Sequence, residues 1–262
     1  MIINTQRLFT SLLATSRINV VCDVGSMNGA DALKFRDAVP EAHIYAFEPN
    51  PENLQLMRAN RALQERNIQV EPLAATNRDG EAMFFLVDAD YRSQNDCRRG
   101  MSSLYKREGD WASADVVQVN TTRLDTFLAD KCAPDARLAL WIDAEGKAFE
   151  VIEGLAGMTE RTLLLHVEVE TAACIGTEQK LYPDVKASLE RLGFAQLATD
   201  HSPRCTQFNA LFLRSNLPAV MQIRAKASLV HARLRYLLGQ ALHKVCPACL
   251  RRYYAIFRRV GK

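Results

Sequence analysis

Short apolar runs rich in β-branched residues alternate with longer segments of helical period through the first 217 residues. Such alternation is typical of βαβ units, in which parallel strands form a sheet and helices cover both of its faces. The apolar runs predict strands at residues 18–24, 42–48, 68–74, 138–143, 163–169, 194–199 and 208–213. The segments between them predict helices at residues 30–39, 51–63, 147–156 and 179–192. We therefore expect an α/β fold with one large, doubly wound sheet.

The alternation is interrupted between residues 80 and 120. Residues 80–87 and 116–120 predict two short strands, and the polar stretch after the first of them, through Arg99, predicts a loop. Inserts between βα units usually form lids or substrate loops. We therefore expect a β-rich insert beside the binding site.

The ends of the strands hold the candidate ligand-binding residues, because ligands of a doubly wound sheet bind beyond the carboxyl ends of its strands. Asp23 lies near the end of the first apolar run, and Gly25 and Gly29 let the following turn approach a ligand closely. The spacing of these glycines differs from the G-x-G-x-x-G fingerprint, which counts against a nicotinamide cofactor. Glu48 ends the second strand, where a carboxylate can accept both hydroxyls of a ribose.

Ionisable residues also gather at two later strands. Asp143 and Glu145 follow one strand, and His166 and Glu168 lie near the end of the next. Together they predict a crevice in which pKa values shift and acid–base chemistry occurs. A carboxylate there could take the proton of a hydroxyl, or two of them could hold a divalent cation, and the sequence leaves both open. The alternative is structural, since acidic residues offset a helix dipole and an apolar strand often buries a histidine.

Six short motifs follow one another between about residues 18 and 213. They are Asp23-Val-Gly-Ser-Met-Asn-Gly29, Tyr45-Ala-Phe-Glu-Pro-Asn-Pro51, Ala74-Ala75 before Asp79-Gly80, Ser102-Ser103-Leu104, Thr122-Arg-Leu-Asp-Thr-Phe-Leu128, and Ile142-Asp-Ala-Glu-Gly146 with Val151-Ile-Glu-Gly154. In this order they resemble the FkbM family of class I S-adenosylmethionine-dependent methyltransferases.

The resemblance implies a seven-stranded Rossmann-like sheet with its last strand antiparallel, within a methyltransferase domain formed by residues 1–217. It implies S-adenosylmethionine as the methyl donor and a hydroxyl of a glycan, glycolipid precursor or small metabolite as the acceptor. The implied cofactor-binding residues are Asp23, Gly25, Ser26, Asn28, Gly29, Glu48, Asn50, Ala75 and Ser103, with Asp23, Gly25 and Gly29 at the methionine end and Glu48 at the ribose. The catalytic candidates are Asp143, Glu145, His166 and Glu168.

One departure from the family pattern leaves the acceptor open, and two other functions remain as alternatives. Trp141 stands where the family often has Lys, two residues before Asp143, so the acceptor is not carried over from the family. A nicotinamide-dependent oxidoreductase and a non-catalytic binding protein with the same fold remain the alternatives. The first would bind a nicotinamide dinucleotide, and the second would show no turnover.

The last 45 residues differ in charge from the rest of the chain. Residues 218–262 contain ten Lys and Arg and no Asp or Glu, although the whole chain carries a net charge of only +3. Val230, Leu234 and Leu237 share one helical face of this tail with Ala241 and Val245. Such a basic helix can lie on anionic lipid, or pack on its own domain or on a second subunit of a homodimer, and both remain open.

Three further patterns bear on location and partners. No apolar run approaches the roughly 18 residues of a membrane span, and residues 1–16 do not form a secretory signal. The seven scattered Cys do not suggest a disulfide framework. We therefore expect a cytoplasmic protein, with peripheral contact at the inner face of the membrane if the tail binds lipid. No nucleic acid is expected, because no binding motif accompanies the basic charge.

Overall fold

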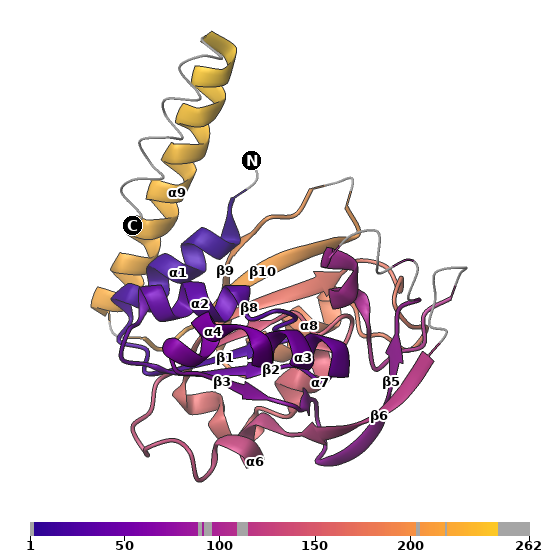
Figure 1. Ribbon diagram of the computed structural model, residues 1–262. Helices are drawn as coiled ribbons and strands as arrows, with labels where there is room; N and C mark the ends of the chain where they lie inside the picture. Colours follow the sequence, from indigo (N-terminus) through magenta and orange to yellow (C-terminus); the bar gives the residue numbers. More distant parts are fainter. Residues whose placement is uncertain are drawn as a thin grey trace.

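The centre of the molecule is a seven-stranded sheet (Figure 1). The computed structural model describes residues 3–88, 91, 96–108, 115–202, 205–217 and 219–245. In spatial order the strands are β3 (Ile68–Glu71), β2 (His43–Phe47), β1 (Val20–Val24), β7 (Leu138–Ile142), β8 (Thr162–Glu170), β10 (Gln207–Arg214) and β9 (Phe194–Thr199). Strand β10 is antiparallel to both of its neighbours, whereas the pairs among the other strands are parallel. The expected doubly wound sheet with an antiparallel last strand is thus confirmed.

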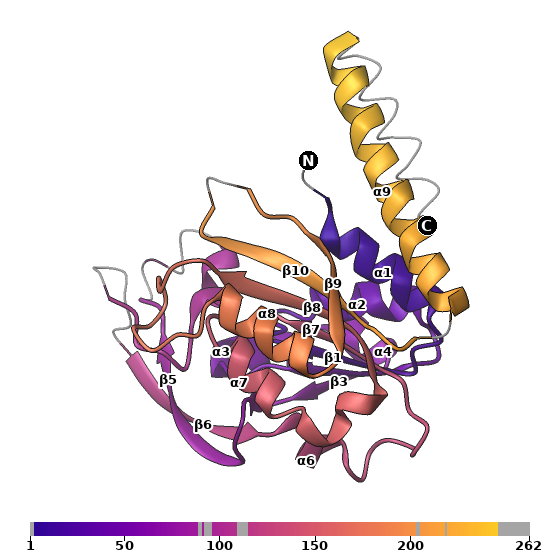
Figure 2. The same cartoon turned by 180° about the vertical axis from the view of Figure 1, so that it is seen from behind.

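Two layers of helices cover the two faces of this sheet (Figure 2). One face is covered by α1 (Thr5–Thr15), α2 (Ala30–Ala38), α3 (Pro51–Ala59) and α4 (Arg61–Glu65). The other is covered by α6 (Leu124–Leu128), α7 (Ala148–Glu153), α8 (Tyr182–Arg191) and the 3-10 helix η2 (Ala156–Arg161). Because both faces are covered, every residue of β1 and β7 is buried, which explains why these strands are continuous apolar runs.

The predicted strand at residues 68–74 is wrong as a single element. Strand β3 ends at Glu71, and β4 (Ala74–Ala75) belongs to a separate three-stranded sheet with β6 (Asp115–Thr122) and β5 (Gly80–Leu86). Pro72 lies between the two strands and has no backbone N–H to give to a ladder, which accounts for the break. This second sheet is the expected β-rich insert. The 3-10 helix η1 (Asp96–Met101) lies in the connection from β5 to β6.

Helix α1 and the division between α3 and α4 were not predicted. Helix α1 has an N-cap, since the Asn4 side chain accepts from the Arg7 N–H at 2.8 Å, and it buries Phe9 and Leu12 against the sheet. The predicted helix at 51–63 is two helices, because the side chain of Asn60 accepts from the Ala62 N–H and starts a new one. Short polar side chains of this kind favour helix starts over helix interiors.

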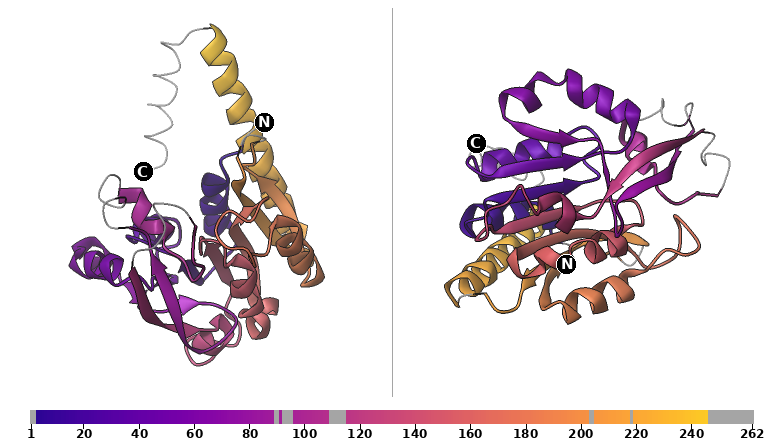
Figure 3. Two further views of the ribbon diagram at one scale, coloured as in Figure 1. Left: turned by 90° about the vertical axis from the view of Figure 1, so that its right-hand side faces the viewer. Right: turned by 90° about the horizontal axis from the view of Figure 1, so that it is seen from below.

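Helix α9 (Ala219–Val245) extends away from the body of the molecule (Figure 3). Its first turns pack on α1, and it lies at the opposite end of the molecule from the insert strands β5 and β6. Residues 246–262 of the predicted tail lie outside the described residues. Within the part of the chain that is described, no helix combines the length and the apolar character needed to cross a membrane.

Candidate functional site

Glu48 joins the turn after β1 to the start of α3. Its two carboxylate oxygens each accept a backbone N–H, from Met27 at 2.7 Å and from Asn50 at 2.8 Å. Glu48 is only 4% exposed, and this burial raises the pKa of its carboxyl to about 7, although the two N–H donors act in the opposite direction. The side chain of Asn53 is a third donor to the same carboxylate. The structure thus holds Glu48 firmly at the carboxyl end of β2.

The tips of β1 and β7 approach each other closely at Gly25. The Asp143 N–H donates to the carbonyl of Val24 at 2.9 Å. A Cβ built on Gly25 would stand 1.8 Å from the carbonyl oxygen of Asp143, and Gly25 has a φ of +81°. Both the contact and the backbone conformation therefore require glycine. This close contact places Asp143 next to the turn that follows β1.

The other predicted residues of the β1 turn have structural partners. Asp23 is buried and accepts from the Ser26 hydroxyl at 2.6 Å, and burial raises the pKa of its carboxyl to about 7. Asn28 is exposed, and its side chain accepts from the Ala30 N–H at the start of α2. Gly29 is the left-handed N-cap residue of α2. Of the predicted cofactor residues in this turn, only Gly25 lines the pocket described next.

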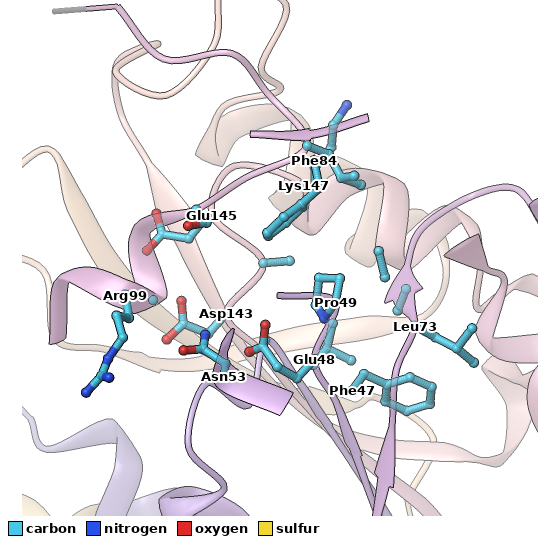
Figure 4. A pocket seen from close by; sticks show the side chains of 18 residues that line it. Phe47, Glu48, Pro49, Asn53, Leu73, Phe84, Arg99, Asp143, Glu145 and Lys147 are labelled. Carbon is cyan, nitrogen blue, oxygen red and sulfur yellow. The ribbon is translucent and has the colours of Figure 1, made fainter. Parts of the chain in front are cut away.

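A pocket with a volume of about 50 Å³ opens at the carboxyl ends of β1, β2 and β7 (Figure 4). Figure 4 shows Glu48, Asn53 and Asp143 gathered on one side and Phe47 and Leu73 on the other. The lining residues are Val24, Gly25, Phe47, Glu48, Pro49, Asn53, Leu73, Ala74, Ala75, Phe84, Arg99, Gly100, Ser102, Leu104, Asp143, Ala144, Glu145 and Lys147. The pocket therefore combines an apolar slot with a row of carboxylates.

Three carboxylates meet beside the pocket. Strands β7 and β8 pair in register up to Ile142 and Val167, which places Asp143 beside Glu168. Asp143, Glu145 and Glu168 each offer one oxygen, and these oxygens lie within 4.8 Å of one another. Burial, followed by the charges of its two neighbours, raises the pKa of Glu168 well above its usual value. The hydrogen bond between the two side chains raises the pKa of Glu168 and lowers that of Asp143.

Glu145 is tied to the insert. Its Oε2 pairs with the Arg107 guanidinium at 2.5 Å, and its backbone carbonyl accepts from the Ser103 hydroxyl at 2.7 Å. Burial and the charge of Asp143 raise the pKa of Glu145 to about 7 against the effect of Arg107. Ser103 thus supports the site through the backbone, while its neighbour Ser102 lines the pocket. The sequence predicted Ser103 but missed Arg107, because a contact across 38 residues leaves no local pattern.

His166 lies on the α1 side of the sheet. Its ring stacks on Trp141 with 3.5 Å between centroids, and its Nε2 contacts the hydroxyl of Thr5 at 3.0 Å. That hydroxyl donates to Asp200, so Nε2 of His166 carries the hydrogen. Burial lowers the pKa of His166 to about 3, and the ring stays neutral. The structure does not bring His166 into the pocket, where the sequence placed it among the catalytic candidates.

Asn50 and Ala75 complete the predicted set. Ala75, in β4, lines the pocket. Asn50 is fully buried, caps α3 by accepting from the Glu52 N–H at 3.0 Å, and has an Nδ2 with no hydrogen-bond partner among the described residues. Sequence reasoning missed Asn53, whose only signal is its place in the first turn after the Glu48 strand end.

A protein-family model and one characterised relative match this chain. A family model described as the methyltransferase FkbM domain matches residues 23–195. The 2-O-methyltransferase NoeI of Sinorhizobium fredii (strain NBRC 101917 / NGR234) is 26% identical over 167 residues. The matched region covers 62% of this chain and 65% of NoeI, slightly less than two thirds of that protein.

Two solved structures are similar at lower identity. A precorrin-6y C5,15-methyltransferase from Geobacter metallireducens GS-15 has a TM-score of 0.40 and 14% identity, over 79% of this chain and 84% of that one. The magnesium protoporphyrin IX methyltransferase (ChlM) of Synechocystis PCC 6803, solved with bound SAM, has a TM-score of 0.41 and 11% identity, over 80% and 81%.

Proposed function

The chain belongs to the FkbM methyltransferase family, and from this premise we propose that it transfers a methyl group from S-adenosylmethionine to a hydroxyl. The acceptor is a glycan, a glycolipid precursor or a small metabolite. The observation that carries the proposal is the single pocket in which Glu48, at the end of β2, faces Asp143 and Glu145, which follow β7. One end of this pocket suits a nucleoside, and the other suits removal of a proton.

The residues of the pocket fit the proposed cofactor. Glu48 and Asn53 offer carboxylate and amide oxygens to the two hydroxyls of a ribose. Phe47, Leu73 and Phe84 provide an apolar slot for a flat base. Bound S-adenosylmethionine supplies a methyl group that its sulfonium has already activated. The protein then has to orient the acceptor and accept its proton.

Asp143 is the proposed proton acceptor. It lines the pocket, and the hydrogen bond from protonated Glu168 stabilises its ionised form, whereas burial raises its pKa overall. A base whose pKa lies above its usual acidic range takes a hydroxyl proton more readily at neutral pH. Glu168 is then a positioning residue, since it acts through Asp143. The neighbouring Glu145 is held by Arg107 and orients the acceptor.

The three carboxylates beside the pocket also support an alternative mechanism that uses a divalent cation. Because Asp143, Glu145 and Glu168 place oxygens within 4.8 Å of one another, they could hold a Mg²⁺ or Mn²⁺ ion, which would acidify the acceptor hydroxyl. Chelation by EDTA followed by addition of either ion separates the two mechanisms. Activity that survives EDTA supports proton transfer to Asp143, and activity restored only by the ion supports the cation.

The name of NoeI supports a hydroxyl acceptor, since that relative is a 2-O-methyltransferase. The test is transfer of an isotopically labelled methyl group to a panel of free sugars, lipid-linked sugars and small alcohols. We expect Asp143→Asn to abolish transfer while cofactor binding remains. Glu168→Gln should retain much of the rate, because its amide N–H can replace the donor to Asp143.

Two outcomes would overturn the proposal. Cofactor binding without turnover on any acceptor would favour the non-catalytic alternative. Binding of NAD in place of S-adenosylmethionine would favour an oxidoreductase. Equal loss of rate in Asp143→Asn and Glu168→Gln would contradict the separate roles of base and positioning residue, and would leave the transfer reaction itself in place.

A further inference from the structure

Helix α9 is attached to the body by one face only. Ala225 is 2% exposed and belongs to the core that α1 shares with the sheet, and the partly buried Met221, Leu229 and Ala232 pack against that core. The Arg224 guanidinium also donates to the carbonyl of Thr15 at the end of α1, at 3.2 Å. These contacts fix the direction of α9, which extends beyond the body (Figures 1 and 2).

The opposite face of α9 is apolar and exposed. Ile223 is 65% exposed, Val230 53%, Leu234 52% and Leu237 55%. At 100° per residue these four side chains fall within an arc of about 60°, across the helix from the packed face. Elsewhere in the described part of the chain, the exposed large hydrophobic side chains are Leu56 at 44%, Met83 at 53% and Val116 at 43%, and none of them lies on α9. The four therefore form a continuous stripe, which we call the α9 stripe, and such stripes mark contact surfaces.

Basic residues border the α9 stripe along one edge. Lys226 and Arg233 lie there, and both are exposed. Residues 219–245 contain five Lys and Arg and no Asp or Glu. An apolar face bordered by long cationic side chains is the pattern of helices that lie in the interface of anionic membranes.

We propose that α9 docks the protein on an anionic lipid surface through the α9 stripe. Charge selects lipid over a second copy of the chain. Two stripes packed together would bring two helices side by side, each basic and without an acidic residue to pair with the other. Anionic headgroups supply the opposite charge. The insert strands lie at the other end of the molecule, so a membrane against α9 leaves the insert side of the pocket uncovered (Figure 3).

The experiment is flotation of the full chain with vesicles of phosphatidylglycerol and phosphatidylcholine, compared with vesicles of phosphatidylcholine alone. We expect binding to the anionic vesicles only, and release by added salt. Lys226→Gln with Arg233→Gln should weaken binding roughly 25-fold, because each basic residue near an anionic leaflet contributes about 1 kcal/mol, or about fivefold. The matched control is Arg58→Gln with Arg61→Gln, which removes the same charge from exposed positions elsewhere.

The stripe itself is tested by Val230→Gln, Leu234→Gln and Leu237→Gln together, with Leu56→Gln and Val116→Gln as the control for loss of exposed apolar surface. The triple variant should lose vesicle binding at an unchanged melting temperature, and the control should bind normally. The proposal is overturned if the native chain does not bind anionic vesicles, or if the triple variant and the native chain bind them equally. The α9 stripe would instead be a dimer interface if the native chain sediments as a dimer without binding vesicles and the triple variant sediments as a monomer.

Discussion

Replacing Gly25 by alanine tests the contact that brings β1 and β7 together at the pocket. The added Cβ would stand 1.8 Å from the carbonyl oxygen of Asp143, although real Cβ atoms essentially never come closer than 3.0 Å to another heavy atom. One of the two backbones must therefore move by about 1 Å in a tightly packed region. The left-handed φ of +81° adds a second cost, which is independent of the clash.

The two costs can be estimated separately. A left-handed backbone costs a non-glycine residue about 1–2 kcal/mol. Overpacking of a filled site adds about 1–3 kcal/mol. The Gly25→Ala variant should therefore lose about 2–5 kcal/mol in free energy of unfolding, which corresponds to roughly 5–20 °C in melting temperature for a chain of this size.

Gly193→Ala is the matched control. Gly193 has a φ of +85°, but the nearest atom to its added Cβ would be a guanidinium nitrogen of Arg214 at 3.5 Å, an ordinary contact. This variant should show only the backbone cost of about 1–2 kcal/mol. Urea unfolding of both variants measures the difference. Equal destabilisation of the two would refute the close approach of Gly25 and Asp143.

The same substitution should also slow catalysis. Moving the Asp143 backbone by about 1 Å displaces the proposed base, and a shift of that size can cost about 100-fold in rate. We therefore expect Gly25→Ala to lose about that factor in methyl transfer at a temperature where it is folded. Gly193→Ala should keep the native rate.

Three further predictions concern buried titratable groups. Burial raises the pKa of Asp23, Glu48 and Glu145 to about 7, so the ligand-free folded protein holds more protons than the unfolded chain. The free energy of unfolding should then fall as pH rises from about 4 through 7, and an increase in urea titrations would contradict this. Arg107→Leu leaves Glu145 without its partner and should cost about 3–5 kcal/mol at alkaline pH, and less below the pKa of Glu145, where that carboxyl is neutral. His166→Phe removes the hydrogen bond to Thr5 and should lower the free energy of unfolding by about 1–3 kcal/mol. Methyl transfer should continue at the native rate. A slower rate in the folded variant would show that His166 contributes to catalysis.

The sheet and the ends of its strands could be predicted because their signals are local. Runs of buried residues identify β1 and β7, and the glycine turn after β1 and the carboxylate after β2 follow from where such strands end. Strand pairing then brings Asp143 beside Glu168, as the sequence predicted for neighbouring parallel strands. The break at Pro72 was missed, although a proline cannot donate to a ladder and marks such a break.

The remaining features depend on contacts between distant segments. Arg107 reaches Glu145 from the insert, and neither residue carries a pattern that identifies the other. His166 and Glu168 lie on one strand, yet a stack on Trp141 and a hydrogen bond to Thr5 hold His166 beneath α1. The burial of His166 depends on helix α1, whose short amphipathic pattern was not recognised in the sequence.

The most direct test of the proposed methyltransferase is calorimetric titration of the purified protein with S-adenosylmethionine, S-adenosylhomocysteine and NAD. We predict micromolar binding of the first two and none of NAD. Glu48→Gln should weaken binding by about 10- to 100-fold, since it removes a charged hydrogen-bond acceptor, whereas Glu52→Gln, at an exposed position on α3, should bind normally. Absence of S-adenosylmethionine binding, or equal binding by native protein and Glu48→Gln, would contradict the account.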